Sequence, residues 1–372
     1  MSRNSILNKR HTALGSKLDG DTWNDMPIPW SYRADAHDEV VAVRTRAGLY
    51  DVSALNIINV SGADAESVLD RLVTIDVKAM KPGTSRLAAE VDENGALCDD
   101  IMIIRDSKDT FRVSHGSGKT PQQLKQLAKG KKVKVAADLD AHILSLQGPK
   151  SLAILAPHVD FKLASLPYFK HQKTTLFGRD VYLARGGYSG ERGYEVYCAA
   201  KDAVHLWDSI LEAGKAHGII AASWNSLELT RMEAGLLFFP FEMPEGDTTP
   251  WEVNMGWGVD LDKKGDYIGK EAVLKLRGRE RVKHTGLICD SDKAPPAGAK
   301  VLRGGKEIGV VTSGSFSRYL MLSIAMVHVK PEHSQIGTEV EVVFGKNKTV
   351  KGRIARTPFY DPLRLRTHPE GR

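Results

Sequence analysis

The sequence predicts an α+β protein in which a small all-β domain follows a longer region of mixed helices and strands. A chain of 372 residues is longer than one compact core usually supports, so two or three domains are expected. Helical and strand-like patterns alternate up to about residue 280. From about residue 283 the pattern changes to short, closely spaced strands broken by glycine and proline, which favours a separate barrel or sandwich.

The first part of the chain alternates between the two patterns. Residues 35–48 carry helical spacing, and Gly48 is a plausible helix stop. Residues 49–62 alternate like strands, and residues 63–75 return to helical spacing. Further segments follow as a polar helix at 120–129 and strands at 86–91, 100–105, 110–115 and 132–137. These segments predict one alternating module of helices and strands.

The middle of the chain continues this alternation. Residues 141–155 read as a strand, a Gly-Pro turn and a helix, and residues 180–199 read as two strands joined by glycines. Residues 202–214 form an amphipathic pattern that stops at a glycine, and residues 225–235 repeat that arrangement. The charged stretch 275–284 is the best candidate for a linker to the C-terminal strands.

The charge balance limits the classes of partner. The net charge is +6 with a pI near 9.0, but the densest basic run, residues 129–135, lacks interleaved aromatics. A solvated basic edge is therefore expected, and no nucleic-acid partner. The longest apolar runs, such as 234–241, are shorter than the ~20 residues of a membrane helix. The first residues carry no signal-peptide pattern, so a cytoplasmic protein without a membrane partner is expected.

The cysteines and histidines carry no metal signature. Cys98, Cys198 and Cys289 lie far apart without CxxC spacing, which predicts buried free thiols. The twelve histidines are scattered, so no metal centre is expected. The GxSxG, HExxH and Walker motifs are also missing from the sequence.

Acidic residues remain as candidates for catalysis. Asp99 and Asp100 open an apolar strand, so their side chains should point to opposite faces and only one can face an internal cleft. Burial there would suit a carboxyl group to proton exchange near neutral pH. Glu195 lies in a strand between Tyr194 and Val196, and its carboxylate could accept two parallel N–H donors of a heterocycle. A turn-forming acid pair and an exposed strand acid are the alternatives.

Seven segments together resemble a known family. They are EVVAVRTRAGLYDVS, ENGALCDDIMI, LSLQGP, GGYSGERGYEVY, TRMEAG, NMGWGVDLDKKGDYIGKEA and GVVTSGSFS. In this order they are similar to the T-protein of the glycine cleavage system, the tetrahydrofolate-dependent aminomethyltransferase family. The resemblance implies a three-domain cloverleaf, with two mixed α/β domains and a C-terminal β-barrel around a folate cleft. We expect a folate-binding region at 1–280, with its second subdomain at about 52–138, and the barrel at 281–372.

The resemblance also implies a set of site residues. Asp99, the first acid of the pair, is expected to face the folate as the catalytic group. Glu195 is expected to hold the pterin ring, and Tyr188 to line the same pocket. Arg231 matches a family arginine and is expected to contact the cofactor, tetrahydrofolate. The basic surface is expected to attract polyglutamate tails, with candidates in Lys119 and Lys173.

Four positions depart from the family pattern. Leu87 stands in place of a tyrosine, Gly116 in place of an asparagine, Ala54 in place of a histidine, and Leu227 in place of the arginine that meets the folate tail. These changes predict a divergent paralogue, resembling the folate-dependent demethylases, that takes a one-carbon group from a small methylated amine, betaine or sulfonium donor. Residues expected on the donor side are His115, Trp251, Glu252 and Tyr32, although Trp251 and Tyr32 could be ordinary core aromatics.

Three other functions remain open. The first is the T-protein itself, which acts on a lipoyl carrier protein. The second is a non-catalytic folate-binding protein, although the region EAGLLFFPFE lacks the cysteine of that group. The third is the folate-binding half of an amine oxidase, working beside a separate oxidase chain.

Overall fold

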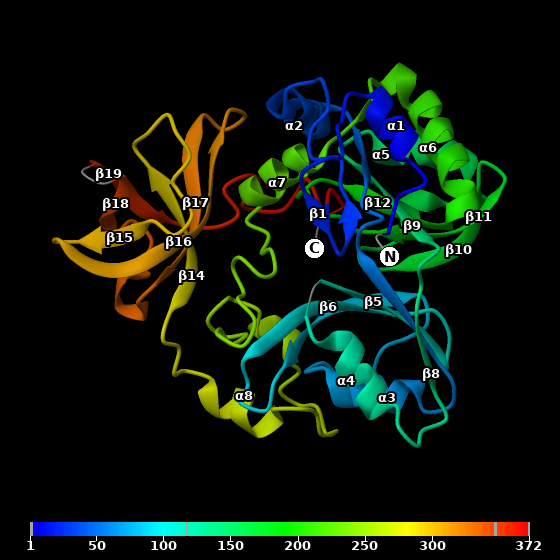
Figure 1. The fold of residues 1–372 in the computed structure, drawn as a ribbon, viewed down its shortest axis with the longest axis horizontal. Helices are drawn as coiled ribbons and strands as arrows, with labels where there is room; N and C mark the ends of the chain where they lie inside the picture. The colour runs from blue at the N-terminus through cyan, green and yellow to red at the C-terminus, as the bar shows by residue number, and fades with distance from the viewer. Residues whose placement is uncertain (1–2, 117, 346–347, 371–372) are drawn as a thin grey trace.

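Three β-sheets organise the protein in a computed structural model that describes residues 3–116, 118–345 and 348–370 (Figure 1). The first is an open mixed sheet, the second is open and antiparallel, and the third is a closed barrel, in agreement with the cloverleaf prediction. Within these ranges, none of the helices combines the length and the apolar composition needed to cross a bilayer.

The first sheet has six strands in the order β10-β11-β12-β9-β3-β13. Their bounds are β10 (His171–Leu176), β11 (Arg179–Arg185), β12 (Gly193–Ala199), β9 (Ala141–Gln147), β3 (Gly48–Asp51) and β13 (Ile220–Ala221). The helices of this unit are α1 (Asn8–Ala13), α2 (Ala36–Thr45), α5 (Ser151–Leu155) and α6 (Ala200–Gly214). Helix α6 packs on β9 and β12, where Leu206, Trp207 and Ile210 enter the core. A short hairpin, β1 (Thr22–Trp23) with β2 (Met26–Pro27), lies near this unit.

The predicted helix stop at Gly48 is wrong. Helix α2 ends at Thr45, and Gly48 begins strand β3. A Cβ atom at residue 48 would lie 2.6 Å from Cγ2 of Val43 and 3.1 Å from the Cβ of Ala222. Glycine is therefore needed where the strand passes close to the helix, and its function here is packing.

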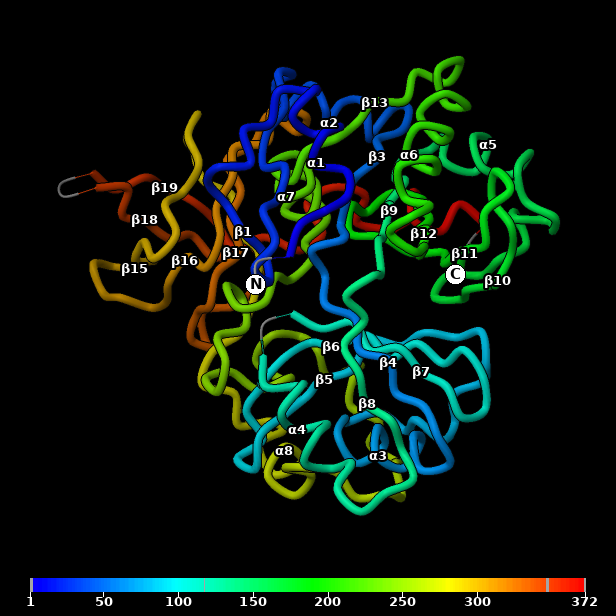
Figure 2. Tube along the Cα trace, turned by 45° about the vertical axis from the view of Figure 1, so that its right-hand side comes forward, coloured from blue at the N-terminus to red at the C-terminus, as the bar shows by residue number. Residues whose placement is uncertain are grey.

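The second sheet has five strands in the order β5-β6-β7-β4-β8. Their bounds are β5 (Thr84–Val91), β6 (Leu97–Arg105), β7 (Thr110–His115), β4 (Asn56–Ser61) and β8 (Lys134–Ala137). Helices α3 (Ala65–Leu72) and α4 (Thr120–Leu127) lie together beneath this sheet (Figure 2). Leu69 and Leu124 from these helices join Phe111 in the core of the unit. The basic run ends in β8, an edge strand, which agrees with the prediction of a solvated edge.

The third sheet closes into a six-stranded barrel in the order β14-β17-β16-β15-β18-β19. Its strands are β14 (Lys283–Cys289), β15 (Lys300–Arg303), β16 (Lys306–Ser317), β17 (Leu322–Val329), β18 (Glu339–Gly345) and β19 (Lys348–Ala355). Helices α7 (Trp224–Glu233) and α8 (Lys270–Leu276) precede it, and α7 packs on β16 and β17. The predicted linker 275–284 overlaps the end of α8 and the start of β14.

The C-terminal segment leaves the barrel and returns to the first sheet, as the red trace in Figures 1 and 2 shows. Arg185 of β11 donates a hydrogen bond to the carbonyl oxygen of Thr367 at 3.1 Å. The hydroxyl of Thr367 donates to the carbonyl oxygen of Gly190 at 2.9 Å, and Arg366 donates to Glu191 at 3.2 Å. These contacts fix the segment 356–370 against the first unit.

The three cysteines are free and buried, as predicted. Burial raises the pKa of each thiol to about 12, so the thiols are protonated at neutral pH.

Candidate active site

A cavity of about 940 Å³ lies where the first two sheets, helix α7 and the start of β14 come together. Its wall is mainly apolar and aromatic, with a small number of charged groups, as is usual for a small-molecule site. The aromatic residues that line it are Trp23, Trp30, Tyr168, Phe169, Tyr188, Tyr197, Trp224, Phe238, Phe239, Phe241 and Trp257.

Strand β6 places Asp100 on the cavity wall, together with Met102 and Ile104. Alternation along the strand turns Asp99 to the opposite face, where it is fully buried. The prediction that one acid faces a cleft and the other accepts backbone donors is therefore correct. Asp100, and not Asp99, lies on the cavity wall, because the sequence does not reveal which face of β6 is turned inward; the catalytic role expected of Asp99 stays a prediction.

Backbone N–H groups hold the carboxylate of Asp99. Its Oδ1 accepts from the N–H of Asp100 at 2.8 Å, and its Oδ2 accepts from the N–H of Gly116 at 3.1 Å. Burial raises the pKa of Asp99 to about 6 despite these hydrogen bonds. The backbone also passes close to Asp99 at Gly118, where a Cβ atom would lie 3.0 Å from Oδ2 of Asp99 and 2.7 Å from the carbonyl oxygen of Cys98.

Asp100 is in a different electrostatic environment. Burial, followed by the neighbouring charge of Asp99, raises the pKa of Asp100 well above its usual value. A carboxylic acid that keeps its proton in a cavity can donate a hydrogen bond or a proton to a bound molecule. Asp100 is therefore the better candidate for acid–base work at this site.

Glu195 lies on β12 across the cavity, in a row with Ser145 of β9 and Ala184 of β11. Among the residues that the structure describes, Tyr197 is its one hydrogen-bond donor, at 3.1 Å. Burial raises the pKa of Glu195, and the bond from Tyr197 opposes this shift. The carboxyl group thus retains capacity for further hydrogen bonds toward the cavity, which fits a ligand with adjacent N–H groups.

Tyr188 and His115 both line the cavity, where the sequence predicted them. The Tyr188 hydroxyl donates to the carbonyl oxygen of Leu237. His115 is almost fully buried, and its Nδ1 has no partner among the described residues. Burial lowers the pKa of His115 to about 4, so the imidazole is neutral at neutral pH. A buried ring nitrogen without a partner is costly unless a ligand or water bonds to it.

Arg231 does not line the cavity, so the structure gives its predicted contact with a cofactor no support. The side chain is fully buried and forms ion pairs with Glu228 and, at 3.0 Å, with Glu242. It also donates to the hydroxyl of Ser313 in β16 at 3.1 Å. Arg231 therefore joins helix α7 to the barrel. The sequence motif identified a buried structural arginine.

Three predicted donor-side residues also lie away from the cavity. Trp251 is a core residue whose Nε1 donates to the carbonyl oxygen of Val273 at 2.7 Å. Glu252 is buried and accepts from the Arg281 side chain at 3.1 Å. The Tyr32 hydroxyl bonds to Nδ1 of His11 at 2.9 Å. Trp251 is therefore a core aromatic, as the alternative had it, whereas Tyr32 is half-buried beside His11 and does not belong to a core cluster of the described residues.

Three of the four departures from the family pattern lie in the cavity wall, and the fourth, Ala54, lies in the core. Leu87, Gly116 and Leu227 all line the cavity, although they come from three separate elements. A Cβ atom at Gly116 would lie 3.2 Å from Cδ1 of Phe239 and 3.3 Å from Oδ1 of Asp99, so a larger residue would require rearrangement. These three departures therefore change the wall of one cavity.

The sequence analysis did not predict one histidine of the cavity wall, nor most of its aromatic residues, which we call the aromatic rim. Phe241 and Trp257 line the cavity and are 55% and 59% exposed. The ring centroids of Trp23 and Phe238 lie 5.0 Å apart, on the same wall. His284 of β14 lines the cavity, and both of its ring nitrogens are buried without a partner among the described residues. The apolar run at 234–241 was the only sequence signal for this rim.

The predicted basic candidates are also corrected. Lys119 pairs with Glu245 at 3.1 Å away from the cavity, and the exposed Lys173 of β10 does not line it either. The cations of the cavity wall are Lys170, Arg185 and Arg364.

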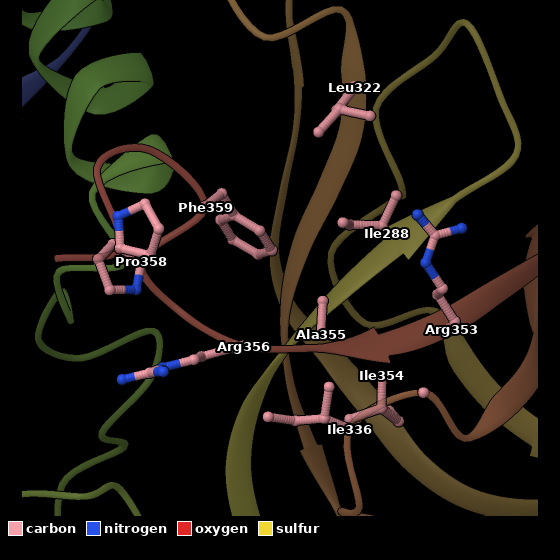
Figure 3. Close-up of a pocket in the computed structure, with 11 residues that line it drawn as sticks. Ile288, Leu322, Ile336, Arg353, Ile354, Ala355, Arg356, Pro358 and Phe359 are labelled. Carbon is pink, nitrogen blue, oxygen red and sulfur yellow. The ribbon is translucent and has the colours of Figure 1, made fainter.

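A smaller hollow of about 320 Å³ lies on the barrel (Figure 3). Its wall is mostly aliphatic and includes Phe359, while Arg353 and Arg356 are its charged residues. Since this wall contains no acid, histidine or nucleophile, the larger cavity is the better candidate for catalysis.

Comparison with known proteins identifies the family. Residues 7–263 match the GCVT N-terminal domain, and residues 283–361 match the glycine cleavage T-protein C-terminal barrel domain. The chain is 39% identical over 379 residues to the heme-dependent oxidative N-demethylase gamma subunit of Ectopseudomonas mendocina (strain ymp), covering 99% of each chain. It is 35% identical over 352 residues to the aminomethyltransferase of Bacillus velezensis, covering 93% of this chain and 94% of the relative. The solved glycine cleavage system aminomethyltransferase T of Bartonella henselae matches with a TM-score of 0.89 at 25% identity, covering 97% of this chain and 99% of that one. These matches confirm the resemblance of the seven segments, and the chain belongs to the glycine cleavage T-protein family.

Proposed function

We propose that this protein is a tetrahydrofolate-dependent one-carbon transferase that works beside a separate oxidase. The oxidase would act on a small N-methylated amine, and this chain would transfer the released carbon to the folate. The observation that carries the proposal is that Asp100 and Glu195 line one cavity together with Tyr188. The likeness to an N-demethylase gamma subunit over nearly the full chain supports the oxidase partner.

The donor set of the cavity fits tetrahydrofolate. A reduced pterin has a flat ring with adjacent N–H donors, which match the free hydrogen-bonding capacity of Glu195. The aromatic wall provides apolar surface for the ring, and about 940 Å³ is within the range of small-molecule pockets. When bound, tetrahydrofolate supplies nucleophilic amines that accept a carbon at the oxidation level of formaldehyde.

The redox step belongs to the partner. Removal of two electrons and a proton from an N-methyl group gives an iminium ion, and water converts it to formaldehyde and the demethylated amine. Tetrahydrofolate, held by Glu195 and the aromatic wall, would accept this carbon, and its two N–H hydrogens would leave with the carbonyl oxygen as water. This transfer needs no oxidant, so the protein residues have to handle protons only. The expected product is 5,10-methylene-tetrahydrofolate.

Asp100 is the residue that we assign to this proton transfer. Burial and the charge of Asp99 raise its pKa, which favours the protonated carboxyl group that would donate to the departing oxygen. After donation, the carboxylate stabilises positive charge that develops on a neighbouring nitrogen. Asp99 does not meet the substrate in this proposal. It holds the backbone of Asp100 and Gly116 and is a positioning residue.

A second candidate function is the aminomethyl transfer of the glycine cleavage system with a lipoyl carrier protein. The 35% identity to an aminomethyltransferase favours it. The altered cavity residues Leu87, Gly116 and Leu227 count against it, because they change the chamber that an ordinary T-protein uses. A non-catalytic folate-binding protein would need no acid at Asp100.

Anaerobic calorimetry with tetrahydrofolate tests the proposal. Micromolar binding to the wild type and at least about tenfold weaker binding to Glu195→Gln are expected, because the amide presents an N–H group where the ring needs an acceptor. Glu212→Gln is the matched control, since Glu212 is exposed and pairs with Lys215 on the surface. A folded wild type that does not bind tetrahydrofolate would contradict the proposal.

A further inference from the structure

One part of the cavity wall carries two cations and is formed by Tyr168, Phe169, Lys170 and Arg364, which we call the cationic lobe. The first three residues directly precede β10, and Arg364 comes from the C-terminal segment. The rings of Tyr168 and Phe169 lie 4.3 Å apart, and His368 packs edge-on against Tyr168 at 4.6 Å. Arg364 also lies beyond residue 361, where the match to the family barrel domain ends.

The two cations of the lobe have no acidic partner in the described part of the chain. Among the described residues, neither Lys170 nor Arg364 takes part in an ion pair or donates a side-chain hydrogen bond. Arg185, the third cation of the cavity wall, differs because it pairs with Glu370 and donates to Leu166 and Thr367. Half-buried positive charges without partners beside an apolar cavity indicate an anionic ligand.

The backbone holds Arg364 in a conformation that is unfavourable for most residues. Its φ is 56°, in the left-handed region that non-glycine residues seldom adopt. The N–H of Arg364 donates to the carbonyl oxygen of Asp361 at 2.8 Å, and the N–H of Arg366 donates to Oδ2 of Asp361 at 2.6 Å. The turn at 361–366 is thus fixed from inside, and it carries Arg364 to the cavity wall.

The lobe is continuous with the wall that carries Glu195. Burial raises the pKa of Tyr168, the positive charge of Arg364 opposes the shift, and the negative charge of Glu195 adds to it. Both charges therefore lie close enough to act on one hydroxyl. A ligand with an N–H edge at one end and an anion at the other could use both groups.

Helix α7 offers no cation to such an anion. Leu227 lines the cavity at the position where the family resemblance implies an arginine. Arg231 is held in ion pairs by Glu228 and Glu242. Resting on the proposed function, we propose that Lys170 and Arg364 form a carboxylate site that binds the glutamate end of tetrahydrofolate. The pair then takes the role of the arginine that Leu227 replaces, from two segments outside helix α7.

A carboxylate on the methylated donor has the same chemistry, so the experiment must separate the two sources. Anaerobic calorimetry would compare tetrahydrofolate, 6-methyltetrahydropterin, which lacks the glutamate tail, and N,N-dimethylglycine. The proteins would be the wild type, Lys170→Gln, Arg364→Gln and the double variant, with Arg364→Lys to restore a charge. Lys173→Gln is the matched control, because Lys173 is exposed and lies outside the cavity wall.

We expect each single glutamine variant to weaken tetrahydrofolate binding about tenfold and to leave the tail-free pterin unchanged. Arg364→Lys should recover part of the loss, and Lys173→Gln should behave as the wild type. Added salt should weaken tetrahydrofolate binding to the wild type more than to the double variant. These results are binding measurements and do not require turnover.

Two results would overturn the inference while leaving the proposed function intact. One is equal binding of tetrahydrofolate by the wild type and the double variant. The other is a loss confined to N,N-dimethylglycine, which would assign the site to the donor. A wild type that binds neither tetrahydrofolate nor the tail-free pterin would instead remove the proposed function, and this inference with it.

Discussion

The backbone N–H of Asp100 donates a hydrogen bond of 2.8 Å to Oδ1 of Asp99, so the buried acid holds the backbone of the acid on the cavity wall. The other oxygen of Asp99 accepts from Gly116, which joins β6 to the end of β7. The two neighbouring acids therefore have different surroundings. In the proposed function, Asp100 presents its carboxyl group to the substrate, and Asp99 maintains the geometry behind it.

Asp100→Asn should reduce turnover by about 10²-fold or more, because the amide cannot donate a proton to the departing oxygen. The dissociation constant for tetrahydrofolate should change by less than about threefold, since Glu195 and the aromatic wall remain. Single-turnover kinetics and anaerobic calorimetry on the same preparation would measure both. Normal turnover in this variant would remove Asp100 from the mechanism.

Asp99→Asn should act mainly on stability. The amide replaces one of the two oxygens that accept backbone N–H groups, so one buried N–H loses its partner. The free energy of unfolding should fall by about 1–3 kcal/mol in a urea titration. If stability were unchanged and turnover were lost, Asp99 would have the direct role that the sequence first suggested.

Glu90→Gln should change how stability depends on pH. Glu90 is fully buried opposite Asp99 in the β5–β6 register, and burial raises its pKa to about 8. Between its unfolded pKa of about 4.3 and 8, the native state holds a proton that the unfolded state lacks. Stability contributed by this proton is therefore lost as the pH rises through that window.

Urea unfolding of the wild type and Glu90→Gln at pH 5 and pH 8 would measure the difference. The variant should gain stability relative to the wild type at pH 8 by a few kcal/mol, at about 1.4 kcal/mol per pKa unit. The comparison cancels the contributions of the buried histidines, which titrate in both proteins. Parallel pH profiles would show that Glu90 has an ordinary pKa in the folded protein.

Arg231→Met should destabilise the protein without a specific effect on folate binding. The substitution leaves Glu242 buried without its cation, which typically costs about 3–5 kcal/mol. The double variant Arg231→Met with Glu242→Leu should recover much of the loss, since the unpaired charge is gone. Tetrahydrofolate affinity per folded molecule should stay near the wild-type value. A selective loss of affinity would return Arg231 to the cofactor site.

The sequence predicted the elements well where periodicity decides them. The amphipathic pattern at 202–214 became α6, which ends at Gly214, and the short strands after residue 283 became the barrel. The role of a glycine was harder to predict, because Gly48 has a packing role at a strand, while Gly235, with a φ of 61°, comes after the C-cap residue Ala234 of α7.

The site was harder to predict because it depends on which face of an element is turned inward. Alternation in β6 was visible, but only the packing of the sheets identifies Asp100 as the inner acid. Trp251 and Trp257 lie in the same short segment of the sequence, yet Trp251 lies in the core and Trp257 lies at the rim. Arg364 reaches the cavity only because the C-terminal segment crosses back to the first sheet. No local pattern reports a contact of that range.

The most direct test of the account is single-turnover transfer of ¹³C-labelled formaldehyde to tetrahydrofolate, followed anaerobically by NMR. The wild type should form 5,10-methylene-tetrahydrofolate faster than the buffer reaction, and Asp100→Asn should return to the buffer rate while still binding tetrahydrofolate. A wild type that binds tetrahydrofolate but transfers carbon no faster than buffer would contradict the assignment of one-carbon transfer to this cavity.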